Sequence, residues 1–354
     1  MRVLIEQLRD GEELNAAQVR EAVEGLVDEG VANGVKGEFL QALRAKGETA
    51  EEIAWFAGEL LARAVDPEID EEKLSGPMLD VCGTGGDGMG MFNVSTTAMF
   101  LLAAGGAVVV KHGNRGITSK SGGADVLEAL GVAIDQPPAA LRECIGETGL
   151  GFIFAPAYHP AFKVIGPVRK ELAARGVATI FNILGPLLNP ARPGYQLAGI
   201  FSERLLPKYA RVLGMLGRRR AWAVHGSSAG VAGVDELTTL GMNHYCAVTE
   251  GRVTAHTLDA AGLGFPKAEV EELRGGDGAE NARILEGILA GQVHGAKRDV
   301  VLLNAAAGFV VCGLAGDMAE GIRRAGEALE GGGGLAKLRA LQGFSRHLKE
   351  GGMK

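Results

Sequence analysis

The stretch Met78-Leu79-Asp80-Val81-Cys82-Gly83-Thr84-Gly85-Gly86-Asp87 decides the fold of this chain of 354 residues. Its apolar first half predicts a buried strand, and residues 93–104 predict a helix. The glycines between them offer bare N–H groups at a helix N-terminus, which is a common cradle for phosphate. The stretch lacks the Lys-Ser/Thr ending of a P-loop, and a tight surface turn is the alternative interpretation. Asn93-Val94-Ser95-Thr96 adds amide and hydroxyl donors at the helix start, which favours the cradle.

A second polar turn follows the next predicted strand, residues 107–110. Lys111-His112-Gly113-Asn114-Arg115 ends that strand, and residues 118–123 lead into a helix predicted over residues 124–130. Ligands of open α/β sheets sit beyond the carboxyl ends of the strands, so both turns are expected at one edge of the sheet. A solvated basic loop is the alternative. Two such turns together suit a ligand that carries two phosphate groups.

The rest of the chain alternates strand and helix patterns, which predicts an α/β sheet with helical cover. Before residue 65 the apolar residues recur at helical spacing, and Thr49 with Glu52 three residues later predicts a capping box. The four glycines of residues 331–334 are expected to form a flexible joint before a terminal helix. Further strands are expected at residues 151–155, 196–201 and 221–224, and further helices at residues 204–216, 281–290, 300–312 and 318–329.

Composition and charge exclude several classes of protein. The formal net charge is −7, with −10 in residues 1–75 and +3 in the remainder, so a nucleic-acid-binding protein is not expected. The longest apolar run, residues 98–110, is shorter than the roughly 20 residues that cross a membrane, so no membrane partner is expected. The four cysteines lie far apart without metal-ligand spacing, which favours a reduced cytoplasm.

A predicted helix that starts near His159 carries a candidate site for a carboxylate. Phe162, Gly166 and Arg169 follow an i, i+4, i+7 row on this helix. An arginine beside an aromatic ring is suited to an aromatic carboxylate, which it holds through two parallel hydrogen bonds. An ordinary amphipathic helix with solvated cations is the alternative.

Residues 226–236 carry two further signals. Gly226-Ser227-Ser228-Ala229-Gly230 matches the nucleophile elbow of serine hydrolases, but the residues after it are a poor helix start, which argues against that function. Asp235-Glu236 is a pair of carboxylates that suits Mg²⁺ beside a diphosphate, since Mg²⁺ prefers oxygen ligands. The alternative is that the loop over residues 227–234 leaves this pair in solvent.

Taken together, these strings resemble the anthranilate phosphoribosyltransferase family of tryptophan biosynthesis. The resemblance runs through nearly the whole chain, and the wider fold family also includes pyrimidine nucleoside phosphorylases. The strings that carry it are Leu43 to Thr49, Cys82 to Asp87, Asn93 to Thr96, Lys111 to Arg115, Ser121 to Gly131 and Ile180 to Pro190. The chain departs from the family pattern at Met91, Gly123 and Phe162.

The resemblance implies an α/β fold of the nucleoside phosphorylase/phosphoribosyltransferase type. A small N-terminal helical domain of residues 1–75, joined by a helical segment near residues 160–185, precedes a larger α/β domain of residues 76–354 with a mainly parallel sheet. The resemblance also implies a homodimer that uses small-molecule substrates and Mg²⁺. The reaction is transfer of the phosphoribosyl group of 5-phosphoribosyl 1-diphosphate to the amine of anthranilate.

By matching motifs, the resemblance also implies three sets of site residues. Anthranilate would meet Gly83, His112, Asn114, Phe162 and Arg169, and Mg²⁺ would be held by Ser95, Asp235 and Glu236. Catalysis would come from positioning and charge neutralisation, with Lys111 and Arg169 as candidates, rather than from an acid or base. Phosphoribosyl diphosphate would be held by Gly83, Gly86, Asp87, Met91, Asn93, Val94, Ser95, Thr96, Lys111, His112, Gly113, Asn114, Arg115, Gly116, Ile117, Thr118, Ser119 and Gly123.

Two other functions stay open at this point. A pyrimidine nucleoside phosphorylase on the same fold would use inorganic phosphate, although Arg169 and the Lys111–Arg115 string favour a carboxylate acceptor. A non-catalytic relative that binds nucleic acid would need a basic surface, and the charge of the chain offers little of one.

Overall fold

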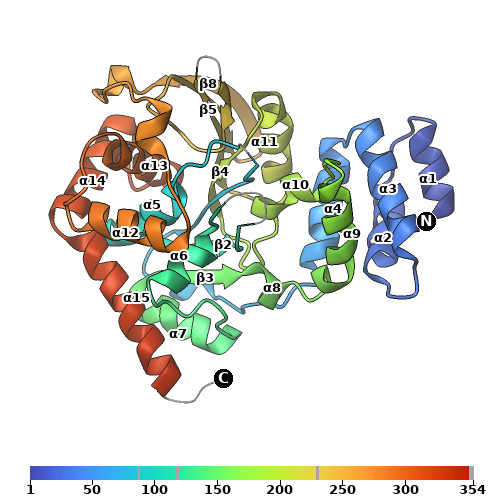
Figure 1. Ribbon diagram of the computed structural model, residues 1–354, viewed down its shortest axis with the longest axis horizontal. Helices are drawn as coiled ribbons and strands as arrows, with labels where there is room; N and C mark the ends of the chain where they lie inside the picture. Colours follow the sequence, from blue (N-terminus) through green and yellow to red (C-terminus); the bar gives the residue numbers. More distant parts are fainter. Residues whose placement is uncertain (87, 117–119, 229–230, 351–354) are drawn as a thin grey trace.

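A helical bundle lies at one end of a larger α/β unit in the computed structural model, which describes residues 1–86, 88–116, 120–228 and 231–350 (Figure 1). The bundle contains four helices from the start of the chain and one from its middle, α9, which packs against α2 and α3. The division expected at residues 75/76 stays a prediction. The helices of the bundle are α1 (Arg2–Arg9), α2 (Ala16–Val27), α3 (Asn33–Lys46), α4 (Ala50–Leu61) and α9 (Phe162–Ala174).

Helix α4 begins at the predicted capping box. The Thr49 hydroxyl accepts from the Glu52 N–H at 3.1 Å, and a Glu52 carboxylate oxygen accepts from the Thr49 N–H at 2.8 Å. These two hydrogen bonds confirm the predicted capping box. The other Glu52 oxygen accepts from the Leu14 N–H at 2.9 Å. This buried carboxylate therefore ties α4 to the start of α2 as well as capping its own helix.

The central sheet is parallel in one half and antiparallel in the other. Its strands run in the order β3-β2-β1-β4-β5-β7-β8, and β6 pairs with β5. The pairs from β3 to β5 are parallel, which confirms the mainly parallel core, and the β5-β7-β8 extension is antiparallel. The strands are β1 (Met78–Gly83), β2 (Val108–Gly113), β3 (Leu150–Phe154), β4 (Tyr195–Gly199), β5 (Arg220–Ser228), β6 (Val231–Val234), β7 (Met242–Thr249) and β8 (Arg252–Asp259).

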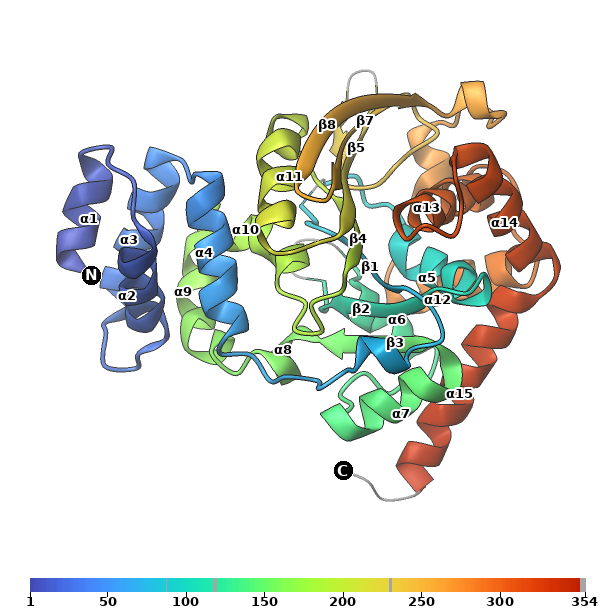
Figure 2. The same cartoon turned by 180° about the vertical axis from the view of Figure 1, so that it is seen from behind.

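Helices cover both faces of this sheet. Leu79 and Val81 of β1 pack into a core with α5, α12, α13, α14 and α15, on the side away from the bundle (Figure 2). Ala221 and Ala223 of β5 pack on the other face, where α10 and α11 join the sheet to the core of the bundle. The covering helices are α5 (Val94–Ala104), α6 (Gly123–Ala129), α7 (Pro138–Thr148), α8 (Ala155–Tyr158), α10 (Phe181–Leu184), α11 (Leu206–Met215), α12 (Gly278–Leu289), α13 (Ala296–Val311), α14 (Met318–Glu330) and α15 (Gly333–Glu350).

Gly331 and Gly332 form a turn, and Gly333 and Gly334 already belong to α15, so the expected flexible joint over all four glycines is wrong. Gly332 has a φ of +72°, which a glycine adopts without strain, and α15 begins directly after it. Gly334 is buried, and a Cβ there would overlap the Leu101 side chain of α5. The glycines therefore let α15 cross α5 at close range.

The order of the strands reverses between β1 and β4. The chain places β2 on one side of β1 and β4 on the other, and such reversals are where open α/β sheets bind ligands. The Thr84 N–H just beyond β1 donates to the Gly199 carbonyl at the end of β4 at 2.9 Å.

Among the described helices, none is both long and apolar enough to cross a membrane.

Candidate active site

The glycine turn after β1 closes around Asp235. The Gly85 N–H donates to an Asp235 carboxylate oxygen at 2.6 Å. A Cβ at Gly83 would overlap that same carboxylate, and one at Gly199 would overlap the Asp235 carbonyl. Glycine is therefore required at the ends of both strands by the approach of Asp235. Gly85 and Gly86 also have φ values of +69° and +81°, in the left-handed region that favours glycine.

Glu236, Ser95 and Lys111 meet at the N-terminus of α5. The Ser95 N–H donates to a Glu236 carboxylate oxygen at 3.1 Å, and the Lys111 ammonium donates to the Ser95 hydroxyl at 3.3 Å and to the Val81 carbonyl. Asp235 and Glu236 are both half-buried, so the alternative that leaves them in solvent is wrong. The structure thus brings together the three residues predicted to hold a metal, with a buried ammonium beside them.

This group has the chemistry of a site for a hard divalent cation. Burial, and then the neighbouring Asp235, raise the pKa of Glu236 to about 8, against the opposing effects of Lys111 and the Ser95 N–H. A cation would relieve this repulsion, and carboxylate and hydroxyl oxygens are the ligands that Mg²⁺ prefers. Within the described residues, no three His, Cys, Asp or Glu side chains cluster as a ready-made metal site. The remaining ligands would therefore be waters or substrate oxygens, as is usual for Mg²⁺.

The described part of the loop between β2 and α6 is hydrogen-bonded to the first turn of α6. One oxygen of Asp125 accepts from the Gly116 and Gly122 N–H groups at 2.8 and 2.7 Å. Arg115, a predicted phosphate ligand, instead forms a two-point ion pair with Glu128, at 2.6 and 3.1 Å. Four predicted positions fall outside the described residues: Asp87, Ile117, Thr118 and Ser119.

Aromatic rings and one arginine form a second cluster beside the end of β2. The His112 ring meets the His159 ring edge-on at 5.3 Å, and His159 stacks on Phe162 at 4.9 Å. The Arg169 guanidinium lies 4.9 Å from the centre of the Phe181 ring and 5.9 Å from that of Phe162. The predicted neighbourhood of Phe162 and Arg169 is confirmed, although α9 begins at Phe162 rather than at His159.

This second cluster is neutral apart from Arg169. Burial lowers the pKa of His112 to about 3 and that of His159 to about 4, so both rings are uncharged near pH 7. Burial also lowers the pKa of Arg169, whose guanidinium has no carboxylate partner among the described residues. The His112 Nε2 atom is buried without a described hydrogen-bond partner. A planar aromatic carboxylate would supply the anion for Arg169 and a polar group for His112.

The other predicted residues lie on the turns after β1 and β2 and at the starts of α5 and α6. Gly123 approaches both Thr96 and Lys111, because a Cβ there would stand 3.0 Å from the Thr96 hydroxyl and 3.6 Å from Lys111 Cε. Met91 forms an isolated antiparallel bridge with Arg274, and the side chain of Val94 is buried in the core. The Asn114 side-chain oxygen accepts from the Arg115 N–H at 2.8 Å.

Several residues of the site were missed by the sequence analysis. His159 was assigned to a basic helix, but it is buried between His112 and Phe162. Phe181 lies in a predicted family string without a role, and only the fold brings it to Arg169. Asn281 was assigned only to a helix, yet it contacts Asn93. Its one sequence signal is the Gly275-Gly276-Asp277 turn that precedes it.

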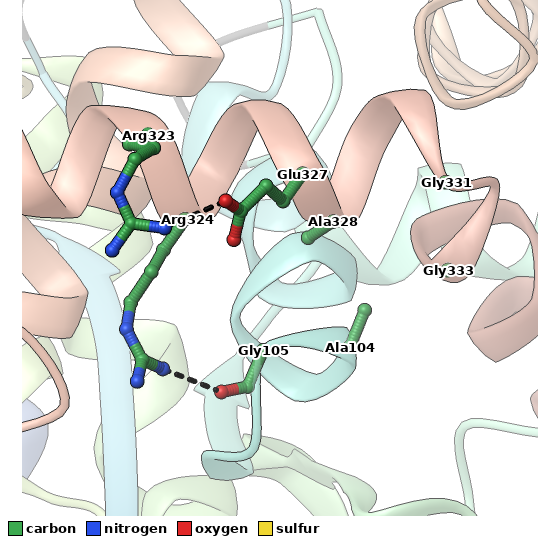
Figure 3. A pocket seen from close by; sticks show the side chains of 8 residues that line it. All are labelled: Ala104, Gly105, Arg323, Arg324, Glu327, Ala328, Gly331 and Gly333. Atoms are coloured by element: carbon green, nitrogen blue, oxygen red, sulfur yellow. Dashed lines mark hydrogen bonds and ion pairs between the residues drawn. The ribbon is translucent and has the colours of Figure 1, made fainter.

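A separate hollow of about 370 Å³ lies at the opposite end of α5 from Ser95 (Figure 3). α5 is 11 residues long, which separates the two places by about 16 Å. Arg323 in its wall pairs with Glu327 at 2.6 Å, and Arg324 lies 3.7 Å from a Glu320 carboxylate oxygen. Because these cations are already matched, we assign the hollow no part in the site.

The site and fold define a class of protein that known sequences share. Residues 75–335 match the family described as "Glycosyl transferase family, a/b domain", and residues 2–64 match "Glycosyl transferase family, helical bundle domain". The protein is therefore a glycosyl transferase of this two-part class.

Similar proteins narrow this class to one family. An anthranilate phosphoribosyltransferase of Anaeromyxobacter dehalogenans (strain 2CP-C) is 45% identical over 337 residues, which cover 95% of this chain and 96% of that protein. One of Methanocorpusculum labreanum is 43% identical over 337 residues, covering 95% of this chain and 96% of that protein. The chain belongs to the anthranilate phosphoribosyltransferase family.

Solved structures of such enzymes have the same fold. The anthranilate phosphoribosyltransferase of Thermus thermophilus is 38% identical with a TM-score of 0.87, covering 97% of this chain and 99% of that one. The enzyme of Saccharomyces cerevisiae in complex with PRPP and Mg is 26% identical with a TM-score of 0.83, covering 98% of each chain.

Proposed function

We propose that this protein transfers the phosphoribosyl group of 5-phosphoribosyl 1-diphosphate (PRPP) to the amine of anthranilate. The products are N-(5-phosphoribosyl)anthranilate and diphosphate, as in tryptophan biosynthesis. The observation that carries this proposal is a pair of side-chain clusters on the two faces of the end of β2. Lys111 reaches the anion cradle at α5, and the next residue, His112, reaches the ring cluster of Arg169.

The anion cradle is the proposed site for PRPP. Its glycine turn and the first turn of α5 present backbone N–H groups, and the helix dipole favours negative charge there. The Lys111 ammonium is fixed by the Val81 carbonyl and the Ser95 hydroxyl, so it offers a preorganised positive charge to a phosphate. The residues proposed to contact PRPP are those given in the sequence analysis, including the four outside the described residues.

The ring cluster is the proposed site for anthranilate. Arg169 would bind the carboxylate, while Phe162 and Phe181 hold the guanidinium from its sides. Neutral His112, with Gly83 and Asn114 at the adjoining turns, would border the ring and its amine. Since the cluster contains no second charge, it selects a planar acceptor with one negative group.

The proposed chemistry depends on position and charge rather than on an acid or base. The bond between C1 and the diphosphate oxygen breaks with its electron pair going to diphosphate, and positive charge develops on C1. The amine nitrogen then forms the bond to C1 with its lone pair and releases a proton to solvent water. Lys111 and the N–H groups of the cradle neutralise the departing charge, while Arg169 holds the acceptor in line.

We further propose that Ser95, Asp235 and Glu236 hold Mg²⁺ beside the diphosphate. Their oxygens fit this ion, and the pKa of Glu236, raised by burial and by Asp235, indicates a place where a cation is favoured. When bound, Mg²⁺ neutralises charge on the leaving diphosphate. Asp235 and Glu236 would fix the ion's position, and the Gly85 and Ser95 N–H groups would orient the two carboxylates.

We also propose that the protein acts as a homodimer in the cytoplasm. All four cysteines are free thiols, which suits a reducing compartment. The homodimer rests on the family resemblance alone, because the predicted apolar stripe of α4 packs inside its own bundle: Ile53, Phe56 and Leu60 are at most 3% exposed.

The loss of anthranilate fluorescence on adding PRPP and Mg²⁺ tests the proposed function. We expect the signal to fall only when both additions and the protein are present. Phosphorolysis of thymidine or uridine by inorganic phosphate, with no loss of anthranilate fluorescence, would instead assign the protein to the nucleoside phosphorylases.

A further inference from the structure

Asn281 has a buried side-chain amide that contacts Asn93, the residue just before α5. It lies in the first turn of α12 and is 2% exposed. Its Nδ2 atom donates to the Asn93 Oδ1 atom at 2.8 Å, and its Oδ1 atom accepts from the Gly276 N–H at 2.8 Å. The α12 helix thus reaches the residue that immediately precedes α5.

Backbone groups fix the direction of both amides in this chain of hydrogen bonds. The Gly276 N–H can only donate, so Asn281 must turn its oxygen toward Gly276 and its NH₂ group toward Asn93. Asn93 must then present its oxygen to Asn281, and its NH₂ group faces the Ser121 carbonyl at 3.3 Å. The Asn93 amide therefore has one orientation, which Asn281 and the Ser121 carbonyl set together, Asn281 by the shorter hydrogen bond.

The segment before Asn281 also binds the cradle through its backbone. The Gly275 N–H donates to the Gly90 carbonyl at 2.9 Å, and the Phe92 N–H donates to the Leu273 carbonyl at 3.2 Å. A Cβ at Gly275 would overlap the Asn281 oxygen, so glycine is required for this approach. Residues 273–281 consequently form a strap along residues 90–93, with α12 also packed against α6 (Figure 1).

We propose that Asn281 is a positioning residue for phosphoribosyl transfer, acting through Asn93. By fixing the Asn93 amide, it presents one NH₂ group between the two turns that cradle the phosphates, at the entry to α5 and at Ser121. The inference rests on the proposed function, in which Asn93 contacts PRPP. Asn281 itself touches neither substrate in this arrangement, and its effect is confined to the PRPP side of the site.

A double-mutant cycle tests this inference. We expect Asn281→Ala to raise the PRPP KM by about 3- to 10-fold, the effect of one lost hydrogen bond, with the anthranilate KM unchanged. Asn93→Ala should raise the PRPP KM by at least as much. Because Asn281 acts through Asn93, the double variant should match Asn93→Ala alone rather than show the product of the two effects.

A matched control separates this role from support of the helix. Asp277 caps the same end of α12 by accepting from the Glu280 N–H at 2.8 Å, and it makes no described contact with Asn93. Asp277→Ala should lower the Tm while leaving the PRPP KM within about twofold of the wild type. If Asn281→Ala does not fold, Asn281→Ser takes its place, because serine keeps a hydroxyl near Gly276 but is too short to reach Asn93.

Three results would overturn the inference in distinguishable ways. Multiplying effects in the double variant, or equal changes in both KM values, would make Asn281 a structural residue while leaving the proposed function intact. An unchanged PRPP KM in Asn93→Ala would remove Asn93 from the site, and the inference with it. No turnover of anthranilate by the wild type would refute the proposed function itself.

Discussion

Two consecutive side chains of β2 reach opposite faces of the sheet. Lys111 donates to Ser95 at the start of α5, while His112 meets His159 near the bundle. This follows from the alternation of side chains along a strand, which separates neighbours to the two faces. One short motif therefore contributes to the two proposed subsites, with Lys111 on the PRPP side and His112 on the side of the Arg169 cluster.

Arg169 is expected to act on anthranilate alone. A charge-assisted contact of an arginine with a carboxylate is worth roughly 1.5–3 kcal/mol, so Arg169→Ala should raise the anthranilate KM by about 10- to 100-fold. The PRPP KM should hardly change. Steady-state kinetics with each substrate varied in turn measure both values.

Arg175 provides the matched control for this variant. It follows α9, is exposed, and pairs only with Glu171 at 3.7 Å among the described residues. Arg175→Ala should leave both KM values unchanged. If Arg169→Ala weakens the two substrates equally, the residue is structural and the acceptor pocket lies elsewhere.

Asp235 and Glu236 are expected to set the Mg²⁺ requirement. The double variant Asp235→Asn/Glu236→Gln nearly preserves shape but removes the two carboxyl groups that would bind the ion as carboxylates, so kcat should fall and the dependence on Mg²⁺ should weaken. The anthranilate affinity should be largely intact. A Mg²⁺ titration of the rate at saturating substrates is the measurement.

Glu12 and Glu13 form a comparable adjacent pair on the surface of the bundle. Glu12→Gln/Glu13→Gln should reproduce the wild-type titration. If the Asp235/Glu236 variant also retains the wild-type kcat at every Mg²⁺ concentration, neither carboxylate belongs to the metal site.

The elements of the parallel half were predictable because local sequence and packing agree there. The strand at residues 78–82 is apolar, its glycine turn ends it, and the following helix carries a continuous apolar stretch that is buried as α5. Strands β7 and β8 were missed because both are partly exposed and mix polar with apolar residues. Of these two strands, only β7 pairs with β5, to which it is joined through more than ten intervening residues, and β8 pairs with β7 in a hairpin.

The residues of the candidate site that belong to local motifs were also predictable from the sequence. Gly83, Ser95, Asp235 and Glu236 belong to recognisable strings, and the fold brings them together. His159 and Asn281 could not be predicted from the sequence, since each acts through a contact with another element rather than through its own motif. A short pattern indicates a turn that binds a ligand, but the side chains that support the turn come from elsewhere in the chain.

The buried histidines that connect β2, α8 and the helical turns after α10 should make stability depend on pH. His112 Nδ1 lies 3.1 Å from the Gly185 carbonyl and His159 Nε2 lies 2.8 Å from that of Leu188. Burial lowers their folded pKa values to about 3 and about 4, so folding favours the neutral rings. Their contribution is present above the unfolded pKa of about 6.5 and is lost as the pH falls toward the folded values.

As the pH falls from roughly 6.5 to 5, each of the two histidines should lower the free energy of unfolding by about 2 kcal/mol. Denaturant unfolding at several pH values measures this slope. His159→Gln should reduce the slope by about one proton. A slope unaffected by His159→Gln would mean that this ring is charged in the folded protein.

At the scale of the whole molecule, the bundle and the sheet share one apolar core. Buried residues of α2, α3 and α4 continue through α10 and α11 to β5. Polar contacts join them as well, with Arg211 of α11 paired to Glu51 of α4 at 2.6 Å. The proposed acceptor cluster lies in this region, because Arg169 comes from the bundle helix α9 and His112 from the sheet.

The oligomeric state is the prediction that belongs to this scale. A symmetric homodimer is the commonest closed oligomer, and the family resemblance implies one here. Light scattering at micromolar concentration should report about 73 kDa, twice the chain mass of 36.7 kDa. A particle of single-chain mass with full activity would contradict the expected dimer.

The central claim is that one site joins the ribose of PRPP to the amine of anthranilate. The most direct measurement is the stoichiometry of products, with anthranilate, N-(5-phosphoribosyl)anthranilate and diphosphate quantified in the same reaction with Mg²⁺. We expect one of each product for every anthranilate consumed, and no diphosphate release when anthranilate is omitted. Release of diphosphate at the same rate without anthranilate would contradict the central claim, because water would then be the acceptor.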